Sequence, residues 1–96
     1  MDWDAGTTDI PTAGSAVQIE NSLRRVLALI VKGRLGNTGN CAIGRSDVSM
    51  TNGLTIRPGE SVPISLSPIG TTRFNTFYLD AANNGDDVEW LVLLYP

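Results

Sequence analysis

The chain has 96 residues, with seven Lys and Arg against ten Asp and Glu, and a formal net charge of −3. This length corresponds to a single domain and leaves no room for an enzyme cleft between two lobes. Histidine is absent, which excludes histidine acid–base catalysis, Ser–His and Cys–His nucleophile systems and most zinc sites. The acidic balance disfavours nucleic acid as a partner. We therefore expect a non-enzymatic protein that needs neither a metal nor a cofactor.

The first 14 residues show no alternating or helical period of apolar residues, and they contain three Asp, two Gly, three Thr and one Pro. They predict an irregular N-terminal arm over residues 1–14, followed by a single β-sandwich domain over residues 15–96. Trp3 and Ile10 are the large apolar exceptions within this arm. Either they anchor the arm on a neighbouring protein, or they pack back on their own domain.

From Ser15 onward, short apolar runs alternate with turn sequences rich in Gly, Pro and Asn. The runs cover residues 16–19, 23–35, 41–43, 54–56, 62–66, 74–79 and 88–95. This spacing predicts an all-β fold of about seven or eight strands in two sheets. The alternation over residues 61–67 places Val62, Ile64 and Leu66 on the buried face, and Pro63 indicates an edge or bulged strand. Asn84-Gly85 suits a hairpin between the last two strands.

Residues 21–33 are compatible with two structures. Asn21 is a suitable helix cap, and helical spacing relates Leu23, Val26, Leu27, Ile30 and Val31. The same residues also fit a strand that is apolar on both faces. Gly33 and Gly36, together with the β-turn spacing elsewhere, favour the strand.

Three features could in principle form a metal site, a catalytic site or a reactive thiol. The densest group of side-chain oxygens comprises Asp80, Asn83, Asn84, Asp86 and Asp87. It suits a solvated turn or a calcium site, and its spacing matches no EF-hand, which favours the turn. A glycosidase carboxylate pair could be drawn from Glu20, Glu60 and Glu89, but a chain of this length leaves little room for a substrate cleft, which disfavours hydrolysis. The lone Cys41 cannot form an internal disulfide, so it is either a small buried hydrophobe or a reactive thiol.

Two segments, 23–35 and 88–95, carry apolar side chains on both faces. A two-layer sandwich has one core, so the second face of each strand needs a cover in water. We therefore expect a homo-oligomer. The candidate interface residues are Trp3, Ile10, Val26, Ile30, Trp90, Leu91, Leu93 and Tyr95.

An ordered series of turn and strand sequences runs through the middle of the chain. It comprises Leu35-Gly36-Asn37-Thr38-Gly39, Ala42-Ile43-Gly44, Val48 and the segment from Asn52 to Ser61. Over residues 16–95 the chain resembles small virion structural proteins of tailed bacteriophages, many of which are capsid decoration (cement) or head-fibre proteins. The resemblance implies a jelly-roll-like β-sandwich, no catalysis, and a homotrimer on the particle surface.

We therefore expect a capsid decoration protein that is made in the host cytoplasm, binds the major capsid protein or another virion protein, and stabilises the head from outside. A tail, collar or fibre component of the virion is the alternative. A small carbohydrate-binding module is the alternative of a different class, although only six aromatic residues are available to stack on sugars. The acidic N-terminus and the lack of an apolar run near 18 residues disfavour a signal peptide and a membrane partner.

Overall fold

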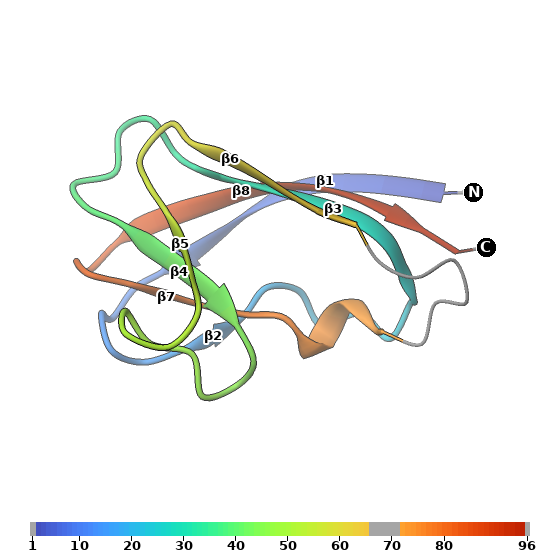
Figure 1. Ribbon diagram of the computed structural model, residues 1–96, viewed down its shortest axis with the longest axis horizontal. Coiled ribbons are helices and arrows are strands. Elements are labelled where there is room, and N and C mark those ends of the chain that lie inside the picture. Colours follow the sequence, from blue (N-terminus) through green and yellow to red (C-terminus); the bar gives the residue numbers. More distant parts are fainter. Residues whose placement is uncertain (1, 66–71, 96) are drawn as a thin grey trace.

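The computed structural model describes residues 2–65 and 72–95, which form two four-stranded sheets packed face to face (Figure 1). The first sheet contains, in spatial order, β1 (Asp2–Ile10), β8 (Asp86–Leu94), β3 (Val26–Gly33) and β6 (Ser61–Ser65). The second contains β2 (Val17–Gln18), β7 (Tyr78–Ala81), β4 (Cys41–Gly44) and β5 (Leu54–Ile56). A short 3-10 helix, η1 (Phe74–Thr76), precedes β7.

The strands pair as a long hairpin that has been rolled up. β1 pairs with β8, β2 with β7, β3 with β6 and β4 with β5, all antiparallel. The pairs β3–β8 and β4–β7 then complete the two sheets. This strand order is a jelly roll. It confirms the all-β prediction, and the extended β3 decides residues 26–33 in favour of the strand.

The core lies between the two sheets and follows the pleat of the strands. Along β8, every second residue from Val88 to Leu94 is buried, as the period of two requires. Val62 and Ile64 of β6 pack against this core, as expected, and β6 is an edge strand, which accommodates Pro63. Leu66, expected on the same face, lies outside the described residues.

Trp90 joins several elements within the core. Its ring packs edge-on against Phe74, with ring centroids 5.0 Å apart, and covers Gly6 of β1, where a Cβ atom would meet the indole at 2.6 Å. Its Nε1 donates to Thr8 Oγ1 at 3.0 Å, and Thr8 Oγ1 donates to the Ile19 carbonyl oxygen at 2.6 Å. The indole therefore ties β8 to β1, to η1 and to the segment after β2.

The expectation of an irregular arm is wrong for residues 2–10. These residues form β1, which pairs with β8 along its whole length, from Asp2 opposite Leu94 to Ile10 opposite Asp86. Asp, Gly and Ala are depleted in strands on average, but an edge strand keeps carboxylates in water while it completes the sheet. Pairing with the long β8 therefore outweighs the low intrinsic strand propensity of this segment.

The Asn84-Gly85 turn is not the hairpin that the sequence suggested. It connects β7 to β8, which belong to different sheets and do not pair. Gly85 adopts a φ of 82° there and donates its N–H to the Ile10 carbonyl oxygen at 2.8 Å. Within residues 2–65 and 72–95, no helix has the length and apolarity to span a bilayer.

Candidate functional site

The outward face of the first sheet is divided into an apolar half and a polar half. In antiparallel pairs, residues directly opposite each other point to the same face. Two neighbouring rows across the four strands are apolar. They are Trp3–Leu93–Ala28–Ser65 and Ala5–Leu91–Ile30–Pro63. We call the apolar members of these rows the apolar half-face: Trp3, Ala5, Ala28, Ile30, Pro63, Leu91 and Leu93.

The next two rows of the same face are polar. The third row runs Thr7–Glu89–Lys32–Ser61, and beyond it Asp9 faces Asp87. Glu89 and Lys32 lie opposite each other, so their charges offset one another locally. The boundary between the halves therefore runs across the strands, and one end of the sheet is apolar on its outer side.

The apolar half-face is open to solvent in this chain. Trp3 is 67% exposed, Ile30 44% and Leu91 40%, while Leu93 and Ala28 are half-buried. Single exposed apolar residues are ordinary, but a contiguous group on a flat sheet marks an interaction surface.

The structure divides seven of the eight predicted interface residues into two groups, and Tyr95 is described below. Trp3, Ile30, Leu91 and Leu93 share the apolar half-face. Ile10, Val26 and Trp90 are instead buried core residues, at 0%, 0% and 6% exposure. We therefore remove these three from the candidate interface, and only Trp3 of the two proposed anchors remains available.

A β-bulge explains why Val26 and Ile30 differ although both are even-numbered. The register with β8 shifts between Val26 and Ala28, so Leu27 is an additional residue on β3. One extra residue reverses the alternation of the strand. Val26 therefore points inward on one side of the bulge, whereas Ala28 and Ile30 point outward on the other.

Tyr95 follows the last residue of β8 and is half-buried. Its backbone N–H donates to the Arg25 carbonyl oxygen at 3.0 Å, and the Arg25 guanidinium lies 5.6 Å from the centre of its ring. A cation–π contact of this kind fixes the ring at the end of the sheet.

Three members of the apolar half-face were not among the predicted interface residues: Ala5, Ala28 and Pro63. Small residues and proline give no hydrophobic signal by themselves. Their position on this face follows only from the register of the paired strands, which places them beside Leu91, Leu93 and Ile30.

The oxygen cluster at the other end of the molecule holds loops together. Asp86 accepts hydrogen bonds from the Thr38 and Gly39 backbone N–H groups, at 3.0 and 3.1 Å. Asp80 accepts from the Gly14 and Ala81 N–H groups, at 2.9 and 2.8 Å. Both carboxylates are buried, and the described residues contain no group of three His, Cys, Asp or Glu placed to hold a metal. These bonds account for the burial of both carboxylates.

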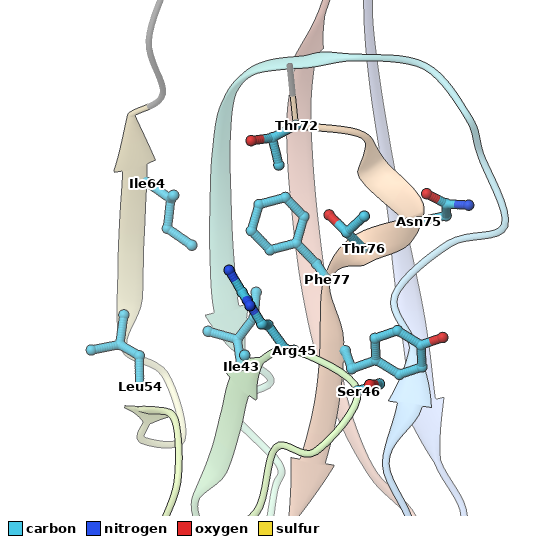
Figure 2. A pocket seen from close by; sticks show the side chains of 11 residues that line it. Ile43, Arg45, Ser46, Leu54, Ile64, Thr72, Asn75, Thr76 and Phe77 are labelled. Atoms are coloured by element: carbon cyan, nitrogen blue, oxygen red, sulfur yellow. The ribbon is translucent and has the colours of Figure 1, made fainter. Parts of the chain in front are cut away.

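A second surface is a groove with a cavity volume of about 780 Å³ (Figure 2). It lies between the sheets at the edge formed by β5 and β6, since Leu54 and Ile64 line one side and Ile43 and Phe77 contribute from β4 and the segment after η1. Its small polar lining residues are Ser46, Thr72, Asn75 and Thr76, and Arg45 is its only charged one among the described residues.

Searches of protein-family models and of curated proteins give no match for this chain.

Proposed function

We propose that the protein is a non-enzymatic virion structural protein, a capsid decoration protein that binds the outside of a phage head as a homo-oligomer and stabilises it. The observation that carries this proposal is the apolar half-face. The resemblance of residues 16–95 to small phage virion proteins supplies the identity of the partner, the major capsid protein or another virion protein.

The size of the apolar half-face favours binding by several copies together. Two rows of residues about 7 Å apart, on four strands about 4.8 Å apart, give a flat area of roughly 270 Å². A standard stable interface buries ~800 Å² on each partner. One half-face is therefore too small for tight binding alone, whereas an oligomer that engages several half-faces at once gains affinity by multivalency. A symmetric shell offers that arrangement.

The fold is compatible with this function and does not select it. Jelly rolls occur in viral capsid proteins and also in lectins. The two classes are therefore distinguished by the residues exposed on the surface, and not by the fold. Trp3 is the only one of the six aromatic residues that is largely exposed, because Phe74 and Trp90 are buried and Phe77, Tyr78 and Tyr95 are half-buried. A single exposed indole beside aliphatic side chains favours a protein contact over a sugar-stacking platform.

The test adds the purified protein to particles that lack it and measures occupancy and resistance of the heads to heat. Wild-type protein should bind and raise the temperature at which heads rupture. Leu91→Glu places a carboxylate in the centre of the apolar half-face and should weaken binding by about tenfold or more. Ser61→Glu places the same group on the polar half of the same face and serves as the matched control, with binding retained.

Two results would contradict the proposal. Leu91→Glu binding as well as wild type would show that this face is not the contact surface. Failure of the wild-type protein to bind heads, combined with binding to tails or to free glycans, would transfer the function to one of the alternatives.

A further inference from the structure

The groove between β5 and β6 contains a cation, Arg45, that has no ionic partner among the residues that the structure describes. Arg45 makes no ion pair and no side-chain hydrogen bond to any residue in the described part of the chain, whereas Arg24, Arg34 and Arg57 each pair with a carboxylate. Figure 2 shows its guanidinium group directed into the groove, between Ile64 and Phe77. An apolar groove with a guanidinium that lacks a carboxylate partner in the described part of the chain suits an occupant that combines an apolar group with an anion.

The opposite edge of the same molecule presents that combination. β1 is the edge strand of the first sheet on the side away from β6. Near its start, Trp3 is 67% exposed, and the neighbouring Asp4 is exposed and accepts only from the adjacent Ala5 N–H at 2.9 Å among the described residues. Asp2, by contrast, is already paired with Arg24 at 2.9 Å.

We propose that the start of β1 of one copy docks edge-on in the groove of a second copy. Trp3 and Asp4 point to opposite faces of β1, so the indole lies against Ile64 on the β6 wall and the Asp4 carboxylate on Arg45 at the wall that follows β4. The bond is charge-assisted and is formed between two groups that have no such partner within the described part of one chain. The inference deepens the proposed function, because it rests on the homo-oligomer and names the contact that builds it.

The position of the two surfaces determines the kind of assembly. They lie on opposite edges of one chain, so the contact is heterologous and repeats from copy to copy until a ring closes. A three-membered ring is the trimer expected above. Trp3 lies at the β1 border of the apolar half-face, so docking its indole sideways leaves Leu91, Ile30 and Pro63 free to face a shell.

The test measures the mass of the full chain by sedimentation or light scattering over a range of micromolar concentrations. Wild type should form a species of about three times the 10.3 kDa chain mass. Trp3→Ala, Asp4→Arg and Arg45→Asp should each weaken association by about tenfold or more. The double variant Asp4→Arg with Arg45→Asp restores the charge pair with its polarity reversed, and it should recover the oligomer.

Two controls separate this contact from general effects of charge and hydrophobicity. Asp9→Arg reverses a charge on the same strand and should leave the oligomer intact. Leu35→Ala removes an apolar side chain that is 80% exposed elsewhere on the surface and should also have no effect. Thermal melts of all variants confirm that they are folded.

A monomeric wild type, an oligomer unaffected by Arg45→Asp, or a double variant that stays monomeric would each overturn the inference. Loss of head binding by Arg45→Asp without a change in mass would also overturn it, since the groove would then hold a segment of the shell protein. A monomeric wild type would also remove the homo-oligomer from the proposed function, whereas the other outcomes leave that function standing. Head binding by the wild-type protein is measured separately, and its absence would overturn the proposed function whatever the mass of the protein.

Discussion

Gly33, the last residue of β3, lies directly under the backbone that leads from β5 to β6. A Cβ atom there would come within 2.3 Å of the Arg57 carbonyl oxygen, and Gly59 N–H donates to the Gly33 carbonyl oxygen at 2.7 Å. The backbone of the segment between β5 and β6 therefore lies in direct contact with the backbone of β3, and only glycine leaves room for this contact.

We expect Gly33→Ala to lower the free energy of unfolding by ~1–3 kcal/mol, because the Arg57 segment must shift to admit a methyl group. Gly36→Ala is the matched control, since a Cβ atom there meets nothing within 4 Å. Chemical denaturation of the two variants measures the difference. Equal stabilities would show that the connection can move aside at no cost.

Asp9 and Asp87 face each other on the polar end of the first sheet. The pKa of the Asp9 carboxyl is raised, chiefly because it shares a hydrogen bond with Asp87, with desolvation and the Asp87 charge acting in the same direction. A carboxyl whose pKa is raised by folding stabilises the fold at low pH, where it is protonated, and this contribution is lost as the pH rises through the raised pKa.

Asp9→Asn should therefore raise the Tm relative to wild type near pH 7, and the gain should vanish at low pH, where the Asp9 carboxyl is protonated. Melting curves across this range measure it. Asp47→Asn is the control, because Asp47 is exposed and its carboxylate forms no ion pair within residues 2–65 and 72–95. A gain that is independent of pH would refute the shared proton between Asp9 and Asp87.

At the scale of elements, β1 is part of the fold and not an appendage. It provides the only partner of β8 on one side, it contributes Ile10 to the core, and Thr8 and Gly6 hold the Trp90 indole. Removing it would expose the backbone groups of β8 and one flank of the core at the same time.

Deletion of residues 2–10 should therefore abolish the cooperative thermal transition, which calorimetry or near-ultraviolet circular dichroism measures. The milder Thr7→Ala, at an exposed position on the outward face of the same strand, should melt close to wild type. A deletion variant with a sharp native-like transition would show that β8 is stable as an edge strand and that β1 is a detachable arm after all.

Because of its pleat, β8 presents neighbouring residues to the outward face of the sheet and to the core. Leu91 is 40% exposed on the outward face, and the adjacent Val92 is fully buried. Val92→Glu would bury an unpaired carboxylate at a cost of several kcal/mol and should unfold the chain, while Leu91→Glu should stay folded with a Tm close to wild type. Melting curves distinguish the two, and unfolding by Leu91→Glu would mean that the outward face is already packed.

At the scale of the whole molecule, Cys41 of β4 reports on opening of the sandwich. Its side chain is buried between the sheets, and burial, with the charges of Asp86, Asp87 and Asp80, raises the pKa of the thiol to about 11. Since only the thiolate reacts readily, the native thiol is protected both by access and by protonation.

We expect a water-soluble thiol reagent near pH 8 to label the native protein slowly, with a rate that follows global unfolding. Protein in denaturant provides the fully reactive control. Rapid labelling of the native chain would show that the second sheet opens locally or that Cys41 is the reactive thiol considered from the sequence.

Part of the fold and of the site could be predicted from local patterns. Alternation located β6 and its inward Val62 and Ile64, Pro63 indicated an edge, and the two-sided apolar segment 88–95 indicated an outward surface with Leu91 and Leu93. The Arg45 groove had no such signal, because it is assembled from four separate strands and the segment around η1.

The sequence by itself determined the all-β class, the turn positions and the presence of more apolar surface than one core can bury, because these depend on residue types and on a period of two along the chain. Only the tertiary structure decided that residues 2–10 are a strand, that a bulge at Leu27 turns Val26 inward, and that Trp90 belongs to the core. The reason is physical: the face that a strand buries is set by the partner it pairs with and by the register of that pairing. Both are contacts between residues far apart in the chain.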